Sequence, residues 1–503
     1  MSADRAVVIG SGLGGLAAAV RLRSKGYRVT VLEALDQPGG RARVFREGGF
    51  TFDAGPTVIT APYLLDELFA LAGRTMSDYV QLVPVDPFYR ILFPDGSTFD
   101  YVGDEERLLA QIESISPRDV DGYRKLAAHA ERIFEVAFMK LADRPFDRPM
   151  DMLRVVPAMA RLSSHRSVYG LVSRYIRDER LRAAFTFEPL LVGGNPFSTS
   201  SIYLLIHWLE RKWGVHCAMG GTTTIVTALV NLLGEMGVDI RLSTPVQEIE
   251  VAAGRAVAVH TESGERIPAK VVVSNADPSR VYRQMIDQKH RRRNTDRSIS
   301  RKRQSMSLFV AYFGSAKQFP DLAHHTIVLG ERYRGLLDDV FRRRTLADDF
   351  SLYLHAPTRT DPTLAPEGNE CFYVLSPVPN NRSGIDWKQE AEPYFEKIRN
   401  SLETRLLPGL GESPVKPFYL TPDDFEGTLR SEDGAAFGPE PILTQSAYFR
   451  YHNRSEDVAG LYFVGAGTHP GGGVPGVLCS AKVLDRLVPD ADGREGAFTV
   501  RST

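Results

Sequence analysis

Short β-branched runs flank a helical pattern of small apolar residues at the start of the chain. Val7–Ile9 form one run and Val29–Leu32 form a second. Between them, Leu, Ala and Val recur at helical spacing over residues 16–25 until Gly26 ends the pattern. This order of strand, helix and strand predicts a βαβ unit.

The hydrophobic pattern changes further along the chain. Residues 104–190 are rich in Arg, Leu, Ala, Met and aromatic residues, which predicts mainly helices. The elements we expect after the first unit are helices at 116–142, 151–178, 224–236 and 390–407, and strands at 239–242, 246–251, 256–261, 270–274, 307–313, 351–355 and 371–377. The tail at 460–488 predicts a strand, a glycine-rich loop and a helix.

Length and charge narrow the classes of protein. At about 100–200 residues per domain, 503 residues predict two or three domains. The 61 Lys and Arg against 62 Asp and Glu give a net charge of −1, which argues against a nucleic-acid-binding protein. The three cysteines, Cys217, Cys371 and Cys479, lie far apart and make no metal or disulfide pattern, which fits a reducing compartment.

Targeting and membrane-spanning segments are not expected. The first strand begins without a preceding apolar signal region, and the uncharged stretches at 189–209, 213–234 and 458–481 are interrupted by Gly, Pro or polar residues. Residues 287–303 hold eight Lys or Arg against two Asp. This basic run is either a solvated loop or a contact for anionic lipid headgroups.

A dinucleotide-binding motif follows the first predicted strand. Gly10-Ser11-Gly12-Leu13-Gly14-Gly15 matches G-x-G-x-x-G and opens the predicted helix. Gly10 permits the tight turn, Gly12 lets the backbone approach a diphosphate, and Gly15 lets helix and strand pack closely. Glu33 ends the second strand, where a carboxylate accepts hydrogen bonds from a ribose diol.

Two further motifs indicate FAD. Pro38-Gly39-Gly40-Arg41 follows Glu33 directly, a pattern typical of FAD oxidoreductases of the amine-oxidase type, in which Arg41 can neutralise the diphosphate. Near the other end, Gly465-Ala466-Gly467-Thr468-His469-Pro470 is followed by a helix that begins at Val474-Pro475-Gly476-Val477. The positive N-terminus of such a helix would stabilise negative charge on reduced flavin.

The whole chain, from about residue 5 to 488, resembles the bacterial-type phytoene desaturases, a family of FAD-dependent carotenoid desaturases. The segments that carry the resemblance are 49–60 (GFTFDAGPTVIT), 190–197 (LLVGGNPF), 351–357 (SLYLHAP) and the motifs at 465–477. The resemblance implies an α/β fold with a Rossmann-type FAD-binding domain of the amine-oxidase and GDI-like kind. It also implies a substrate-binding α+β domain and a helical membrane-facing lobe.

The resemblance places domains and cofactor contacts. We expect a discontinuous FAD-binding domain at 1–80, 215–285 and 425–503, a largely helical substrate and membrane lobe at 80–215, and the α+β domain at 285–425. The residues expected to bind FAD are Gly10, Gly12, Gly15, Glu33, Gly40, Arg41, Val246, Asn275, Gly467, Val474, Pro475, Gly476 and Val477. No metal site is expected.

The implied activity is the insertion of double bonds into phytoene, a C40 polyene, to give neurosporene-type or lycopene-type products. Hydride transfer to the flavin and loss of a proton from the neighbouring carbon would need positioning more than strong side-chain catalysts. Asp151 and Arg154 are the candidate proton or charge handlers, with a surface ion pair as the alternative interpretation. Glu188, His207 and His355 lie in apolar surroundings, where a lone His is more often a hydrogen-bonded core residue.

Other functions stay open at this stage. A C30 or hydroxylated carotenoid desaturase or a carotenoid isomerase is the alternative within the class, and a prenyl or lipid carrier of the same fold is the alternative outside it. We expect a cytoplasmic protein that docks peripherally on the membrane, takes an apolar polyene from lipid, and passes electrons to oxygen or a quinone. The oligomeric state does not follow from the sequence.

Overall fold

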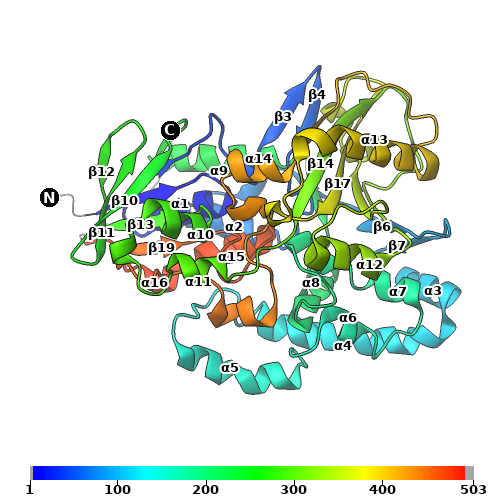
Figure 1. The fold of residues 1–503 in the computed structure, drawn as a ribbon, viewed down its shortest axis with the longest axis horizontal. Coiled ribbons are helices and arrows are strands. Elements are labelled where there is room, and N and C mark those ends of the chain that lie inside the picture. The colour runs from blue at the N-terminus through cyan, green and yellow to red at the C-terminus, as the bar shows by residue number, and fades with distance from the viewer. Residues whose placement is uncertain (1–3, 493–503) are drawn as a thin grey trace.

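Two large sheets and a lobe of helices make up the fold that the computed structural model describes for residues 4–492 (Figure 1). The outermost residues of the predicted FAD-binding domain, 1–3 and 493–503, lie outside the described part of the chain. Segments from both ends and from the middle of the sequence build the first sheet, so this part of the fold is discontinuous in the sequence.

The first sheet is parallel and has the strand order β19-β13-β1-β2-β9. Its strands are β1 Arg5–Ile9, β2 Arg28–Leu32, β9 Asp239–Arg241, β13 Val271–Ser274 and β19 Leu461–Phe463. Ile9 pairs with both Leu32 and Ser274, so the carboxyl ends of these strands meet at one edge. The loops that follow them therefore converge there, where doubly wound sheets bind their ligands.

Helices cover one face of this sheet. They are α1 Leu13–Ser24, α2 Tyr63–Leu71, α9 Thr223–Glu235, α15 Val474–Lys482 and α16 Leu484–Leu487. Every residue of α1 from Leu13 to Leu22 is buried, because α1 lies between the sheet and the helices α2, α9 and α15. A helix enclosed in this way is apolar on all sides rather than amphipathic, which explains its run of Ala and Leu.

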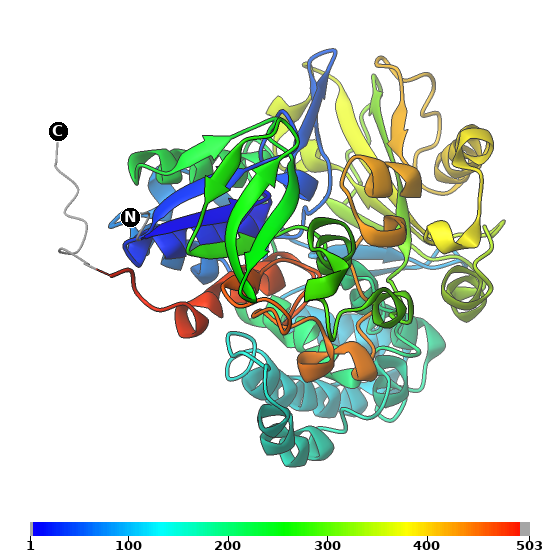
Figure 2. The same cartoon turned by 60° about the vertical axis from the view of Figure 1, so that its left-hand side comes forward.

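The other face is covered by a small antiparallel sheet of β10 Val246–Ala252, β11 Arg255–Thr261 and β12 Arg266–Pro268. Figure 2 shows these green strands in front of the blue strands of the parallel sheet. Val246, Ile249 and Val259 pack there against Val7 and Ile9 in one apolar cluster. The strand β12 is an element that the sequence pattern did not predict.

A second, seven-stranded sheet has the order β18-β14-β17-β16-β15-β6-β7. Its strands are β6 Tyr89–Leu92, β7 Thr98–Tyr101, β14 Ser307–Ser315, β15 His325–Val328, β16 Leu352–His355, β17 Glu370–Val378 and β18 Phe418–Leu420. The helix α13 Trp387–Arg405 packs on one face through Trp387, Tyr394 and Ile398. Residues 89–101 thus join the sheet of the expected α+β domain, although they lie in the stretch predicted as the helical lobe.

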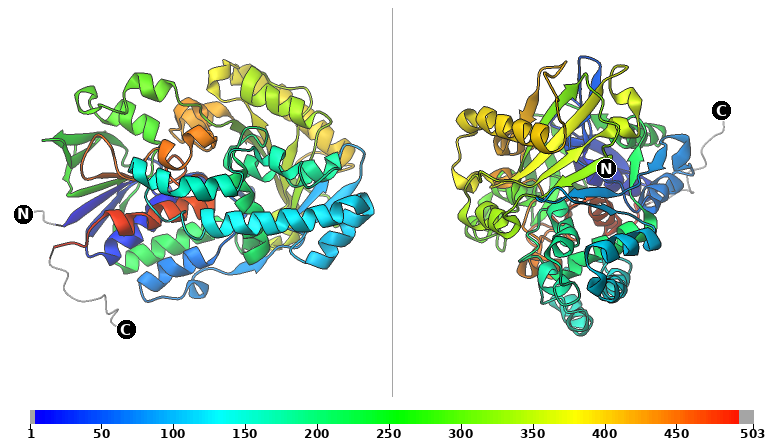
Figure 3. Two further views of the ribbon diagram at one scale, coloured as in Figure 1. Left: turned by 90° about the horizontal axis from the view of Figure 1, so that it is seen from below. Right: turned by 90° about the vertical axis from the view of Figure 1, so that its right-hand side faces the viewer.

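The helical lobe lies along the underside of the molecule (Figure 3). It consists of α3 Glu105–Ile115, α4 Val120–Ala137, α5 Pro149–Arg161, α6 Val168–Val172, α7 Glu179–Ala184 and α8 Leu205–Trp213. Tyr123, Leu126, Ala130 and Ile133 form the buried face of α4. The helix α5 differs because none of its residues is buried. Among residues 4–492, no helix is long and apolar enough to cross a membrane.

Smaller elements connect these parts. They are β3 Val44–Glu47, β4 Phe50–Asp53, β5 Leu82–Pro84, β8 His216–Ala218, α10 Pro278–Arg280, α11 Asp296–Ser300, α12 Tyr333–Asp338 and α14 Pro422–Gly427.

Two helix predictions in the lobe were too long. The helix predicted at 116–142 begins as a 3₁₀ turn at Pro117–Asp119, continues as α4 and ends at Ala137. The helix predicted at 151–178 is divided into α5 and α6. Ser163 interrupts it with φ 60°, and the Ser164 hydroxyl donates to the carbonyl of Met159. Serine side chains that bond nearby backbone compete with helix continuation.

Candidate functional site

A cavity of about 840 Å³ lies where the parallel sheet, the seven-stranded sheet and the helical lobe meet. The loops at the carboxyl edge of the parallel sheet form one part of its wall, and β14–β17 with α5 and α8 form another. A dinucleotide cradle and an apolar chamber are therefore one continuous space.

The glycine loop brings the backbone close to this space. Gly10 has φ 92°, which permits the turn out of β1, and Gly12 begins α1 without a side-chain cap. The free N–H groups of the first turn suit an anion. A Cβ on Gly15 would lie 2.0 Å from the Gly10 carbonyl oxygen. Gly10 and Gly12 line the cavity, whereas Gly15 does not and instead permits the close packing of loop and helix.

Glu33 lies at the end of β2 and is 6% exposed. Its Oε2 accepts hydrogen bonds from the Ser11 backbone N–H at 2.7 Å and the Ser11 hydroxyl at 2.6 Å, and its Oε1 accepts from Leu35 N–H at 2.9 Å. These contacts fix the carboxylate at the cavity wall. Each oxygen keeps a further lone pair that can accept from a ribose hydroxyl.

Arg41 follows two glycines that lie beside the first loop, where Gly39 forms a bridge with Gly12. The Arg41 guanidinium donates to the Ser431 hydroxyl at 2.7 Å, and its buried Nε has no hydrogen-bond partner. Burial lowers the pKa of Arg41, and the charge of Asp277 opposes that shift. A cation with an unused buried donor at the cavity wall fits the diphosphate of FAD.

Three other predicted contacts lie at the same edge. Val246 at the start of β10 lines the cavity, as do Gly40 and Asn275. The Asn275 side chain lies beside the glycine loop, since a Cβ on Gly12 would come 2.7 Å from its Nδ2. The strand order brings these residues together, because β13 pairs directly with β1.

The C-terminal motif contributes the N-terminus of α15. Val474, Pro475, Gly476 and Val477 all line the cavity, and no side chain caps the helix. Gly467 does not line it. A Cβ on Gly467 would lie 2.3 Å from Cδ of Pro278, so this glycine permits packing between two loops instead of facing the ligand space.

The candidate catalytic pair lies away from the cavity wall. Asp151 accepts the N–H of Arg148 in a capping box of α5, and its Oδ1 is 3.9 Å from Nη1 of Arg154. The Arg154 side chain is 74% exposed, and neither residue lines the cavity. Their neighbours Met152 and Val155 line it instead. The geometry favours the ion-pair interpretation, and the catalytic role stays a prediction.

Apolar side chains form the remaining wall of the cavity. The side chains from α5, α8 and the seven-stranded sheet are Met152, Val155, Met159, Leu205, Ile206, Leu209, Leu308, Val310, Ile327, Leu329 and Leu375. Such a chamber accepts a long hydrocarbon by excluding it from water.

Two buried carboxyl groups stand out against this apolar lining. Glu210 lines the cavity, and Glu188 lies near it; both are 1% exposed. Tyr89 donates to Oε1 of Glu210 at 2.6 Å, while Oε2 of Glu210 and Oε1 of Glu188 have no hydrogen-bond partner. Burial raises the pKa of Glu188 to about 8 and raises the pKa of Glu210 well above its usual value. Burial therefore favours the protonated, uncharged form of both carboxyl groups.

His207 lies beside this pair. Its ring nitrogens face the hydroxyls of Tyr101 at 2.6 Å and Tyr123 at 3.2 Å, and burial lowers its pKa to about 3. It is a neutral, hydrogen-bonded core histidine. Nothing in the sequence pattern pointed to Glu210, because the following Arg211 and Lys212 make that turn resemble an exposed surface.

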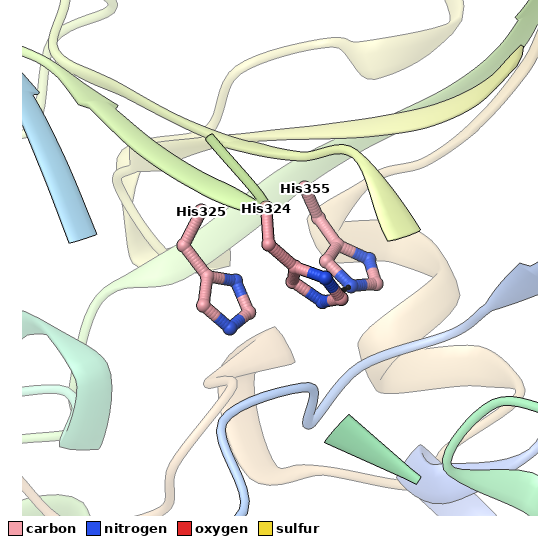
Figure 4. Close-up of side chains that lie close together, drawn as sticks. All are labelled: His324, His325 and His355. Atoms are coloured by element: carbon pink, nitrogen blue, oxygen red, sulfur yellow. Dashed lines mark hydrogen bonds between the residues drawn. The ribbon is translucent and has the colours of Figure 1, made fainter. Parts of the chain in front are cut away.

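Three more histidines, His324, His325 and His355, lie close together (Figure 4). His325 lies opposite His355 on neighbouring strands, and His324 Nε2 is 3.1 Å from His355 Nε2. The three rings offer nitrogens within 4.8 Å of one another, a spacing that a metal ion can bridge. In the described chain, hydrogen bonds already engage both nitrogens of His324, the second with Thr360.

The histidine cluster connects to the cavity through hydroxyl groups. The Tyr353 hydroxyl lies 2.6 Å from Nδ1 of His325 and 2.7 Å from the Thr57 hydroxyl. Both Tyr353 and Thr57 line the cavity. Burial lowers the pKa of His324 to about 4, so the cluster is neutral at neutral pH. It supplies a rigid polar support beneath two cavity hydroxyls.

Comparison with known proteins identifies the family of this chain and several similar proteins. The family model for flavin containing amine oxidoreductase matches residues 13–482. A phytoene desaturase (lycopene-forming) of Pseudescherichia vulneris is 49% identical over 485 residues, which cover 96% of this chain and 99% of the relative. A phytoene desaturase (neurosporene-forming) of Rhodobacter capsulatus is 46% identical over 493 residues, with coverage of 97% and 94%.

Solved structures share the fold at low sequence identity. An oxidoreductase from Methanosarcina mazei matches with a TM-score of 0.65 and 17% identity over 96% of this chain and all of the other. A RAB GDI from Plasmodium falciparum matches with a TM-score of 0.55 and 10% identity over 97% of this chain and 99% of the other.

Proposed function

Because this chain belongs to the family of flavin-containing amine oxidoreductases, we propose that it is an FAD-dependent desaturase that introduces double bonds into phytoene. Neurosporene-type or lycopene-type carotenoids would be its products. The observation that carries the proposal is the continuity of a dinucleotide cradle with an apolar chamber in one cavity of about 840 Å³. Near-complete alignment with phytoene desaturases of both product types supports the choice of substrate.

The protein's own residues bind and orient the reactants. Gly12 and the N-terminus of α1 present free N–H groups, Arg41 offers a cation, and Glu33 offers a carboxylate. These residues would hold FAD, whose chemistry there would be acceptance of the hydride equivalent that the substrate loses. The apolar wall around Leu209 and Val310 holds the polyene in register and excludes water.

The proton that leaves the substrate has no established acceptor. The sequence proposes Asp151 and Arg154, and replacement of Asp151 by Asn tests that role. A tenfold or larger fall in product formation supports proton or charge handling, provided that the melting temperature falls by no more than the loss of a helix cap explains. Unchanged turnover assigns Asp151 to capping of α5 alone, where loss of the cap costs about 1 kcal/mol.

An exposed apolar patch at the cavity rim supports the proposed contact with a membrane. Leu153 and Val156 on α5 are 61% and 46% exposed, and Leu443 and Phe449 on the facing segment are 41% and 47% exposed. Val156, Leu443 and Phe449 also line the cavity. We propose that this patch dips into the acyl boundary of a membrane, so that an insoluble polyene enters the cavity directly from lipid.

The basic run at 287–303 makes a smaller contribution than its composition implies. Arg291 pairs with Asp296, Arg293 with Glu456, and Arg303 with Glu440. Internal ion pairs reduce the charge that this segment can present to anionic lipid. We therefore expect docking on neutral vesicles as well as anionic ones, with only a partial loss at high salt.

Two experiments test the proposal. Pigment analysis of cells that make phytoene and this protein should show neurosporene or lycopene, and phytoene left unchanged would refute the activity. For the electron acceptor, anaerobic turnover with and without an added quinone separates oxygen from quinone. Turnover that needs oxygen excludes the quinone as sole acceptor.

The alternatives give different outcomes in the same assays. A C30 or hydroxylated carotenoid desaturase would leave phytoene and convert the shorter or hydroxylated polyene. An isomerase would change the geometry of a carotene without extending its conjugation. A lipid carrier would show no flavin absorbance after purification with added FAD.

A further inference from the structure

Arg450 is a buried arginine that holds the turn between β19 and α15. The residue is 3% exposed. Its Nε donates to the carbonyl of Thr468 at 3.0 Å, its Nη1 to Pro439 at 3.1 Å, and its Nη2 to Ala466 at 2.6 Å. All of its acceptors are thus neutral backbone carbonyls.

Two of the other buried arginines pair with carboxylates, whereas Arg43 lies over the ring of Phe45. Arg21 pairs with Glu67 and Asp485, and Arg291 pairs with Asp296. Within residues 4–492, no carboxylate lies within 4.0 Å of the Arg450 guanidinium. Carbonyl oxygens satisfy its N–H groups but do not neutralise its charge, and the carboxyl of Asp277 acts on that charge only from beyond ion-pair distance.

The Arg450 charge lies close to the cavity. Arg450 lies directly behind the loop that forms the cavity wall, because Ala466 and Gly472 line the cavity. A Cβ on Gly471 would lie 3.8 Å from Cζ of Arg450 and 3.5 Å from the Tyr203 hydroxyl, and Tyr203 lines the cavity too. One layer of backbone separates the guanidinium from the ligand space.

The positive charge of Arg450 acts on the cavity together with the dipole of α15. The N-terminus of α15 faces the cavity and carries partial positive charge. A full charge in a site of low effective dielectric acts over a longer distance than it does in water. Both effects favour negative charge in the part of the cavity next to residues 472–477.

We propose that Arg450 raises the reduction potential of the bound flavin by stabilising the negative charge that FAD gains on reduction. A hydride equivalent delivers two electrons and one proton to the neutral oxidised flavin, which leaves one net negative charge, while the second hydrogen of the substrate leaves as a proton to solvent. The inference rests on the proposed function only for the presence of FAD. Arg450 acts through the field in the cavity and is a positioning residue.

The competing explanation is a purely mechanical one, in which Arg450 only clamps three carbonyls. Arg450→Gln removes the charge and keeps hydrogen-bonding groups, and Arg450→Lys keeps the charge but cannot reach all three carbonyls. Arg291→Gln is the control, since it removes another buried arginine, one whose charge is paired with Asp296.

The test uses FAD-loaded protein without phytoene. Two quantities are measured for each variant: the midpoint reduction potential and the dissociation constant for sulfite, a probe that adds to oxidised flavin as an anion. Arg450→Gln should shift the redox equilibrium at least tenfold toward oxidised flavin, which is about 30 mV for a two-electron couple. It should also weaken sulfite binding at least tenfold, while Arg450→Lys and Arg291→Gln stay near the wild type.

Two results would overturn the inference. One is an Arg450→Gln protein that binds FAD with unchanged potential and sulfite affinity. The other is equal shifts in the Gln and Lys variants, which would assign the effect to the lost clamp. If the Gln variant holds no FAD, the wild type is compared with Arg450→Lys, and a shift in the Lys variant would assign the effect to the lost clamp. A wild type that binds no sulfite would also refute the stabilisation of negative charge.

The outcome is separable from that of the proposed function. A charge-dependent potential in a protein that leaves phytoene unchanged refutes the substrate and keeps the role of Arg450. Conversion of phytoene by a protein whose reduction potential does not depend on Arg450 refutes the role of Arg450 and keeps the substrate. A wild type that binds no FAD refutes both.

Discussion

Replacement of Glu188 by Gln should flatten the dependence of stability on pH between pH 6 and pH 8. Glu188 is 1% exposed, and burial raises its pKa from 4.5 to about 8. In the unfolded chain this carboxyl ionises near its ordinary pKa, so the unfolded state binds fewer protons than the folded state above pH 4.5. The free energy of unfolding therefore falls as pH rises through this window.

The magnitude follows from the two pKa values. With a pKa of 4.5 in the unfolded chain and about 8 in the folded protein, Glu188 favours the folded state roughly fiftyfold less at pH 8 than at pH 6. This change in the folding equilibrium constant is about 2 kcal/mol for this one group. Glu210 adds to the effect in the wild type, because burial raises its pKa and the charge of Glu188, once that group ionises, raises it further. The glutamine side chain keeps a similar shape and does not titrate.

Urea unfolding followed by tryptophan fluorescence at pH 6 and pH 8 gives the comparison. The wild type should lose about 2 kcal/mol more than Glu188→Gln over this range. Glu106→Gln on the exposed face of α3 is the control and should behave as the wild type. Equal pH dependence in Glu188→Gln and the wild type would refute the assignment of a buried protonated carboxyl at this position.

Three further variants test the cofactor site and the rim. Gly12→Val places a Cβ 2.7 Å from Nδ2 of Asn275 and a branch toward the diphosphate space, so FAD affinity in equilibrium dialysis should fall at least tenfold; normal affinity would contradict the site. Gly15→Ala places a Cβ 2.0 Å from a backbone oxygen and should lower stability by about 3 kcal/mol, seen as a lower melting temperature, and an unchanged one would contradict that packing. Leu153→Asp combined with Phe449→Asp should abolish flotation with neutral liposomes, whereas Leu242→Asp, at an exposed leucine outside the cavity rim, should not; equal flotation of all variants would rule out the patch.

The sequence determined the cofactor half of this protein because its contacts are local. Gly10 to Gly15 and Glu33 belong to one βαβ unit, so their spacing along the chain places them at one edge of a parallel sheet. The flavin cofactor, predicted from the motifs at 38–41 and 465–477, and the fold class implied by the resemblance are confirmed by the family match over residues 13–482. The long resemblance outside the motifs added the substrate class, which periodicity by itself did not contain.

Helix boundaries in the lobe were less predictable for a physical reason. Composition favours helix over most of residues 116–178, but Ser163 adopts φ 60° and the Ser164 hydroxyl donates to the Met159 carbonyl, so α5 does not continue. The apolar residues of α5 also could not be told from core residues by pattern. Only the structure shows that Leu153 and Val156 are exposed at a cavity rim.

Tertiary structure decided which polar groups matter, because burial depends on what packs around a residue and not on its neighbours in sequence. Glu210 precedes Arg211 and Lys212 in a surface-like turn of sequence, yet it lines an apolar cavity. Gly467 lies within a flavin motif, yet it packs against Pro278. Arg450 lies outside every motif, and neutral carbonyls hold its charge behind the cavity wall only because residue 439 and the loop at 466–468 fold around it.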